Sequence, residues 1–409
     1  MLVGIISLIS CSKNEVFRQQ LDYGDIDGVT IKPQDALLAL GDMLQTVNTK
    51  SVSDLSEDDL FVIGKNELFA ETKSSSIIDI PDTLLYALNF KSGGFALMAA
   101  NTRINNSVLC ITESGNIGYD NVYEAMRFLD KSSDEETRTG NYAEEEDFID
   151  AGKVYVYSLL ISSAIIDYFD TKPMNYDDAV LTKDAGSQIY GPYLTTKWTQ
   201  NGPFDDMTPN NYPAGCVVIA VAQIMAYNNK PASSEFITSS RPWSLLKEVY
   251  PYNDINNAGS VDAQNAVAYM SKVLGNSKNC AVDYAADGSG SNANKAKRTF
   301  ENYGYKNVTK RLGCESGDIK RIDSQIASGR PVYMGGQRKG GGHAWVIDGL
   351  NGNYYHINWG WQGDCDGYYA KGVFNTSSRH SYDQIYDPGT NVMKGRNYYH
   401  YFRLLLYSL

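Results

Sequence analysis

The chain lacks the residue patterns of several common functional classes. It has no block rich in lysine and arginine, and its 36 basic and 48 acidic residues give a net charge of −12, so nucleic acid is not expected as a partner. It has no Cys-x-x-Cys pair, and its six cysteines are irregularly spaced along 409 residues, which argues against a disulfide framework or a zinc site. One reactive thiol among inert ones is the better interpretation.

No segment is long and apolar enough to cross a membrane as a helix. The apolar start, residues 1–12, is typical of a secretory signal that ends at a small residue. Its end, Leu8-Ile9-Ser10-Cys11, resembles a bacterial lipoprotein signal, in which the cysteine is lipidated and becomes the mature N-terminus. The basic region of such a signal is missing, and a plain apolar strand or core segment is the alternative. We expect export, with an anchor through Cys11 at the outer membrane or surface, or release after processing.

The composition favours a β-rich and loop-rich protein. Hydrophobic residues make up 43% of the chain, enough for two or three domains with cores of their own, and 30 tyrosines and 36 glycines are untypical of a helical bundle. The first half predicts a small α+β domain, with a helix around residues 36–40, a strand at 59–64 and a hairpin that joins 84–90 to 93–100.

The middle of the chain predicts a domain boundary. Residues 131–150 are acidic and poor in apolar residues, which is typical of a solvated linker or an exposed helix face. A helix-like stretch follows at 154–169, and the polar, turn-rich residues 171–190 suit a boundary or a site of proteolytic cleavage. The expected division is a signal at 1–11, an N-terminal domain at 12–170, a cleavage region at 171–190 and a second domain at 191–409.

Cys216 is the strongest candidate for a nucleophile. It follows Gly215 and opens an apolar run, 217–222, that predicts a buried helix. A thiol at a helix N-terminus faces unpaired N–H groups and the positive end of the helix dipole, and both favour the thiolate. Cysteine is not a capping residue, so its place at the helix start has no structural benefit. A core thiol is the alternative, and Cys216 by itself does not decide between the two.

A cysteine nucleophile needs a general base, and the chain has four histidines. His380 lies in a polar loop, and His356 and His400 lie in aromatic runs that are typical of strands. His343 leaves a glycine-rich stretch and enters an apolar strand, where a substrate can reach it. In that strand Asp348 points to the opposite face from His343, and a place in a turn suits it better.

A tryptophan-rich segment, Asn358-Trp359-Gly360-Trp361-Gln362-Gly363, follows His343 in the sequence. A hairpin return over 351–353 would bring this segment beside the His343 strand. The two indoles would shield the imidazole from water, and Asn358 or Trp359 would hold its orientation. Ordinary core packing of the tryptophans is the alternative, and it is compatible with that role.

Together these residues resemble the streptopain-type cysteine peptidases, a papain-like family made with an N-terminal pro-domain. The resemblance implies an α+β fold, in which a papain-like catalytic domain with a helical part and an antiparallel sheet follows a small α+β pro-domain. It rests on Ala214-Gly215-Cys216 with its helix to Tyr227, on residues 341–349 and 356–361, on 194–200 as the start of such a catalytic domain, and on the hairpin 84–100 as part of the pro-domain.

The resemblance implies that Cys216 is the nucleophile and that His343 is its base and later acid, with no metal and no cofactor. Papain-like enzymes use a glutamine six residues before the cysteine in the oxyanion hole, and that position holds Asn210 here. The backbone N–H of Cys216 would be the second oxyanion donor. Trp359 would orient His343 and Trp361 would cover it, with Asn358 as the competing candidate.

The resemblance also implies a latent enzyme that acts on proteins or peptides. The pro-domain would inhibit it by filling the cleft or displacing His343, and removal of the pro-domain by cleavage within 171–190 would activate it. Residues 334–342 are rich in glycine and predict a flexible loop over the bound peptide. The loop glycines are Gly335, Gly336, Gly340, Gly341 and Gly342.

Two other functions stay open at this point. A different Cys–His acyl-transfer enzyme, such as an amidase or a transglutaminase-like protein, would share the dyad but need a different substrate pocket. An inactive peptidase fold on a surface lipoprotein, used for binding, is the non-enzymatic alternative, and the intact Cys–His pair argues against it.

Overall fold

The computed structural model describes residues 30–47, 59–64, 81–131, 145–170, 188–286, 288–312, 316–338, 341–374 and 401–409, with the single residues 50, 55 and 68. The expected signal with Cys11, the expected cleavage region up to residue 187, Gly340, His380 and His400 lie outside the described residues.

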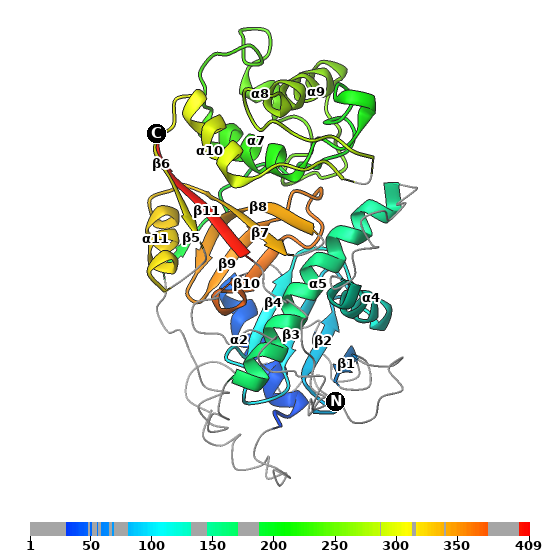
Figure 1. Ribbon diagram of the computed structural model, residues 1–409. Coiled ribbons are helices and arrows are strands. Elements are labelled where there is room, and N and C mark those ends of the chain that lie inside the picture. The colour runs from blue at the N-terminus through cyan, green and yellow to red at the C-terminus, as the bar shows by residue number, and fades with distance from the viewer. Residues whose placement is uncertain are drawn as a thin grey trace, which may run out of the picture.

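A single antiparallel sheet runs through the whole molecule (Figure 1). Its strand order is β1-β2-β3-β4-β10-β9-β8-β7-β11-β6, and the short strand β5 pairs with β8. The first four strands come from the N-terminal part of the chain, and the pairing of β4 with β10 joins them to the strands of the C-terminal part. The strands are β1 Leu60–Ile63, β2 Leu85–Asn89, β3 Phe95–Ala99, β4 Val108–Thr112, β5 Ile189–Tyr190, β6 Lys306–Leu312, β7 Val332–Arg338, β8 Gly341–Asn351, β9 Tyr354–Asn358, β10 Gly367–Ala370 and β11 Tyr401–Ser408.

The N-terminal part has the α+β content that the sequence predicts. The helix around residues 36–40 is α2, Pro33–Val47, which begins at a proline because the first helical N–H needs no partner. The predicted strand and hairpin correspond to β1, β2 and β3, and the hairpin turn uses Gly93 and Gly94 at positive φ. Two more helices, α4 Tyr119–Lys131 and α5 Glu145–Asp170, complete this part.

The linker interpretation is wrong for residues 145–150, because α5 begins at Glu145 and includes them. Acidic side chains in the first turn of a helix are favourable, since the helix N-terminus carries a partial positive charge. The apolar half of α5 packs on the sheet, where Tyr157 contacts the ring of Phe95 and Tyr155 contacts the ring of Trp345. The helix therefore touches strands of both parts of the chain.

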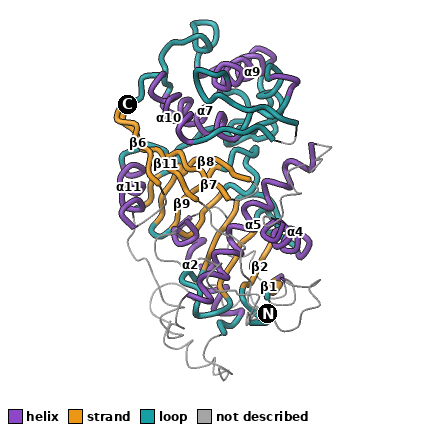
Figure 2. Tube along the Cα trace, in the orientation of Figure 1, coloured by secondary structure: helices purple, strands orange, loops and turns teal. Residues whose placement is uncertain are grey.

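The C-terminal part carries a helical layer on one face of the sheet, drawn at the top of Figures 1 and 2. The helices of this layer enclose a second hydrophobic core, built around the apolar helix that starts at Cys216. They are α7 Cys216–Asn228, α8 Trp243–Leu246, α9 Val261–Gly275 and α10 Ala293–Asn302. Another helix, α11 Ser316–Ala327, packs at the side of the sheet. Two short 3-10 helices are η5 Pro209–Asn211 and η6 Lys371–Phe374.

Strand β8 separates two hydrophobic cores by its alternation. Trp345 and Ile347 belong to the core that is shared with the N-terminal part, whereas Ala344 and Val346 belong to the core of the helical layer. This combination of helices with an antiparallel sheet is the predicted α+β class. None of the described helices is both long and apolar enough to span a membrane.

Two local expectations are wrong. Gly335 and Gly336 lie in β7, paired with Ala344 and His343, and Gly341 and Gly342 begin β8, so none of these four glycines lies in a flexible loop. A Cβ atom on Gly336 would lie 2.4 Å from the hydroxyl of Tyr155, so glycine is needed there for close packing. Asp348 is not a turn residue either: it lies at an irregularity in the β8–β9 pairing and is 1% exposed.

Candidate active site

Cys216 is the first residue of α7, as the sequence predicts. Gly215 precedes the helix at φ 93°, a conformation that favours glycine, and its carbonyl accepts the backbone N–H groups of Val218 and Ile219. The following residues of the helix are buried in the core of the helical layer, while Cys216 itself is only partly buried. The thiol is therefore held at a helix N-terminus, at the edge of the core.

The backbone of β8 reaches the Cys216 thiol. Desolvation by the surrounding atoms raises the pKa of Cys216 to about 11, although backbone hydrogen bonds from Ala344, Val217 and Cys216 itself favour the thiolate. The bond from Ala344 matters for the site, because Ala344 directly follows His343 in the strand. The structure thus brings the segment of the candidate base to the candidate nucleophile, which are far apart in the sequence.

His343 is 8% exposed and is held by the tryptophan-rich segment. Its Nε2 lies 2.8 Å from the backbone carbonyl oxygen of Trp359, and its ring stacks on Trp361 at 4.3 Å between centroids. A carbonyl oxygen only accepts hydrogen bonds, so Nε2 carries the proton and Nδ1 is left as an acceptor. A histidine that acts as a general base through Nδ1 must be in this tautomer.

Asn358, the competing candidate for orienting His343, is used elsewhere. Its Oδ1 accepts hydrogen bonds from Gln223 Nε2 at 2.7 Å and from the backbone N–H of Gly360, and its Nδ2 donates to the carbonyl of Thr196. The amide of Asn358 therefore ties β9 to the helix α7, and the orienting contact to His343 comes from the neighbouring backbone carbonyl.

The residue whose carbonyl holds His343 is itself held through its backbone N–H by a buried carboxyl. Asp366, which is fully buried, accepts the backbone N–H of Trp359 at 2.8 Å. Burial raises the pKa of Asp366 to about 7, against the opposing effect of the nearby Lys197. The turn from Trp359 to Asp366 is thus fixed at both ends, which positions the two tryptophans against the imidazole.

The N-terminal part of the chain covers the candidate base. Tyr155 of α5 lies 5.8 Å from the His343 ring and 6.4 Å from the Trp359 ring, measured between centroids. Burial lowers the pKa of His343 to about 4, against the bond to Trp359, which favours the charged form. With a raised cysteine pKa and a lowered histidine pKa, both groups are neutral near pH 7 in this structure.

Two carboxamides that precede Cys216 in the sequence differ in burial. Asn210, for which the sequence predicts an oxyanion role, lies exposed in the turn η5 at φ 56°, and this role stays a prediction. Gln200 is 4% exposed, and its backbone carbonyl accepts the N–H of Ala214 at 2.7 Å, two residues before Cys216. Gln200 lies farther from Cys216 in sequence than the papain spacing, and it ends the 194–200 segment that resembles the start of the catalytic domain.

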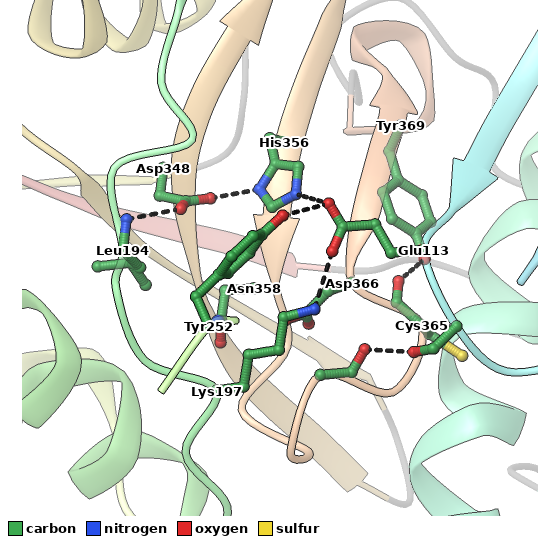
Figure 3. Close-up of polar contacts among 12 residues, drawn as sticks. Glu113, Leu194, Lys197, Tyr252, Asp348, His356, Asn358, Cys365, Asp366 and Tyr369 are labelled. Carbon is green, nitrogen blue, oxygen red and sulfur yellow. Dashed lines mark hydrogen bonds and ion pairs between the residues drawn. The ribbon is translucent and has the colours of Figure 1, made fainter. Parts of the chain in front are cut away.

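A cluster of buried charges, drawn in Figure 3, was not expected from the sequence. Glu113, which follows β4, lies 2.8 Å from Lys197 Nζ and 3.3 Å from His356 Nε2, and it accepts a hydrogen bond from the Tyr252 hydroxyl at 2.5 Å. On its other side, His356 Nδ1 lies 2.6 Å from Asp348. We call these five residues the charged cluster. No local sequence pattern could predict the charged cluster, because its five residues come from segments that are far apart in the sequence.

The pKa shifts of His356 and Glu113 in the charged cluster favour the ionised form of both side chains. Burial would lower the pKa of His356, but Asp348 and Glu113 raise it to about 10. Burial would likewise raise the pKa of Glu113, but His356 and Lys197 outweigh burial and hold it well below its usual range. An imidazolium and an ammonium thus face two carboxylates inside the protein.

The other cysteines that the structure describes carry no comparable feature. Cys110, Cys280 and Cys365 are buried free thiols, and burial raises the pKa of Cys280 to about 12. In the described ranges, no three histidine, cysteine, aspartate or glutamate side chains are grouped so that they could hold a metal ion. The partly exposed Cys216 is therefore the one described cysteine that combines access with a helix N-terminus.

Comparison with known proteins agrees with this geometry. Residues 198–369 match the Peptidase C10 family. Streptopain from Streptococcus pyogenes serotype M1 is 26% identical over 326 residues, which cover 72% of this chain and 75% of streptopain. The resemblance to streptopain-type cysteine peptidases is confirmed. These matches support a cysteine-type peptidase. The region that matches the family, residues 198–369, includes both Cys216 and His343.

Two further relatives extend the comparison. The solved structure of a prointerpain A fragment from Prevotella intermedia is 20% identical, with a TM-score of 0.52, and covers 79% of this chain and 95% of that chain. It supports the fold over both parts of the molecule. The thiol protease/hemagglutinin PrtT of Porphyromonas gingivalis is 27% identical over 219 residues, or 48% of this chain and 25% of that protein.

Proposed function

We propose that this chain is the latent precursor of an exported cysteine endopeptidase. The observation that carries the proposal is the bond between His343 Nε2 and the Trp359 carbonyl, 2.8 Å long, which leaves Nδ1 as the acceptor. Ala344, the residue that follows this base in β8, hydrogen-bonds the Cys216 thiol through its backbone, so the strand that carries the base reaches the nucleophile that the base would activate. The export part of the proposal rests on the apolar start of the sequence and its Cys11.

The mechanism follows from these groups. The Cys216 thiol transfers its proton to His343, and the thiolate attacks the peptide carbonyl carbon. His343 then protonates the leaving amine, and the acyl-enzyme is hydrolysed by water that His343 deprotonates. The backbone N–H of Cys216 at the start of α7 and the carboxamide of the buried Gln200 are our candidates for the oxyanion donors, in preference to the exposed Asn210.

Latency is proposed from the contacts of the N-terminal part. Tyr155 packs against His343, and Glu113 enters the charged cluster among residues of the C-terminal part. In this state burial keeps both the thiol and the imidazole neutral, which disfavours the thiolate. We propose that cleavage within residues 171–190 removes this cover. The name prointerpain A denotes a proform, and this relative therefore supports a precursor with an N-terminal pro-domain.

The test compares wild-type full-length protein with the variant Cys216→Ala during incubation. Wild-type protein should shorten with time, as seen by mass spectrometry, and Cys216 should react with an epoxide inhibitor of papain-like enzymes. The Cys216→Ala variant should stay intact, whereas Cys280→Ala, which removes a buried thiol, should mature normally. Shortening of both wild type and Cys216→Ala at equal rates would exclude self-maturation. A processed protein whose Cys216 resists the epoxide would exclude the peptidase.

A further inference from the structure

The side chain of Glu113 occupies a site that is built by the C-terminal part of the chain. All its polar partners in the charged cluster, Lys197, Tyr252 and His356, lie beyond the proposed cleavage region. The site is largely closed to water, since the side chains of Glu113, Lys197 and His356 are 14%, 8% and 1% exposed. Figure 3 shows the carboxylate between these three side chains.

The cations of the site lose a carboxylate partner when Glu113 is taken away. Asp348 is already engaged, because its Oδ1 pairs with His356 Nδ1 and its Oδ2 accepts the backbone N–H of Leu194. Asp366, the other acid near Lys197, accepts the N–H of Trp359 and has a pKa raised to about 7. Release of the N-terminal part would leave Lys197 Nζ without the carboxylate that lies 2.8 Å from it, and His356 Nε2 and the Tyr252 hydroxyl without their acceptor Glu113. Unpaired buried charge is costly, so this site favours a new anion.

The backbone next to the site favours an extended peptide as the molecule that carries the anion. Glu113 directly follows β4, which pairs antiparallel with β10 through Thr112 and Gly367, and the backbone N–H of Glu113 donates to the carbonyl of Asp366 at 2.7 Å. Departure of β4 would leave the edge of β10 unpaired, and a free strand edge accepts an extended peptide. Strand edge and cationic site lie end to end.

We propose that the peptidase, once freed of its N-terminal part, carries an exosite for an extended peptide segment whose glutamate side chain fills the position of Glu113. This inference rests on the proposed maturation. The segment would add to the edge of β10 and place its carboxylate on Lys197, Tyr252 and His356. The turn that ends at Asp366 begins at Trp359, which holds His343, so the exosite adjoins the catalytic site. It would recruit protein substrates that contain an extended strand followed by glutamate.

The experiment uses the full chain after it has processed itself and after Cys216 has been blocked with the epoxide. The probe is a fluorescent peptide of residues 108–114 with alanine in place of Cys110, compared with the same peptide carrying glutamine in place of Glu113. The glutamate peptide should bind at least about tenfold more tightly, because hydrogen bonds to a charged group are the stronger class. The preference should vanish in Lys197→Met and persist in the control Lys278→Met, which removes an exposed lysine.

Each outcome has a defined meaning. Equal affinity of the two peptides for epoxide-labelled, processed enzyme would overturn the exosite, and so would an active enzyme that never loses residues up to 113. Lack of epoxide labelling at Cys216 would instead overturn the proposed function. If Lys197→Met does not fold, Tyr252→Phe replaces it, since this variant removes only the hydroxyl that donates to Glu113, and the peptide preference should then fall by several-fold.

Discussion

Replacement of Glu113 by glutamine tests how the N-terminal part is held on the peptidase. Glutamine keeps the size and the polar tip of the side chain, but it removes the charge that pairs with Lys197 at 2.8 Å and with His356 at 3.3 Å. Both side chains then stay in a largely buried site, in which Asp348 still contacts His356. We expect weaker docking of β4 on β10 in the Glu113→Gln variant.

The magnitude follows from the burial of the pair. Removing one partner of a buried ion pair costs about 3–5 kcal/mol. The side chain of Glu113 is 14% exposed and that of Lys197 is 8% exposed, so the lower end of this range, about 3 kcal/mol, applies. Since about 1.4 kcal/mol corresponds to a factor of ten, opening of the β4–β10 contact should become about a hundredfold more frequent.

The assay is hydrogen exchange, read by mass spectrometry on a fragment that covers residues 366–370. These residues include the paired segment of β10, whose backbone groups are protected while β4 is docked. The measurement is made in the Cys216→Ala background to prevent processing. Asp82→Asn is the matched control, because it also removes one acidic charge from the N-terminal part but at an exposed position.

The expected result is exchange about a hundredfold faster in Glu113→Gln, with the Asp82→Asn control close to the parent protein. Exchange that differs between Glu113→Gln and Asp82→Asn by less than about threefold, under 1 kcal/mol, would refute the argument that the charged cluster holds the two parts together.

Two further predictions concern catalysis and pH. Gln200→Ala should lower kcat of the processed enzyme by about 100- to 1000-fold, as removal of one oxyanion donor does, while Asn210→Ala should leave it unchanged; the reverse outcome would restore Asn210 to the oxyanion hole. The melting temperature of the Cys216→Ala precursor should fall as the pH rises from about 6.5 towards 10. The pKa of His356 is raised to about 10 in the folded protein. The stabilisation by charged His356 is therefore complete below the pKa of histidine in the unfolded chain, about 6.5, and is lost as the pH rises through the folded pKa. At the acid end, Glu113 has a lowered pKa, so its stabilisation is complete above its unfolded value near 4.3 and is lost as the pH falls from there towards the folded value. A His356→Gln precursor with the same alkaline slope as its parent would contradict this assignment.

Local patterns were sufficient for much of the fold. The helix at Pro33–Val47, the hairpin of β2 and β3 and the helix that starts at Cys216 follow the predicted positions, because periodicity, turn glycines and a preceding glycine act over a few residues. The predicted flexible loop over the glycine-rich stretch is wrong for Gly335 and Gly336, which lie in a strand. Gly336 leaves room for the close packing of Tyr155 and Trp345. A glycine needed for space and a glycine needed for flexibility look the same in a sequence.

By itself the sequence determined which two side chains are proposed to react. Only one histidine leaves a glycine-rich stretch for an apolar strand, and only one cysteine opens an apolar helix, so Cys216 and His343 could be chosen from local context. The tertiary structure decided how they are held. The partner of His343 is a backbone carbonyl, which every residue possesses and no pattern reveals. Glu113 meets Lys197 and His356 across 84 and 243 residues of chain, and such contacts exist only once folding has brought the segments together.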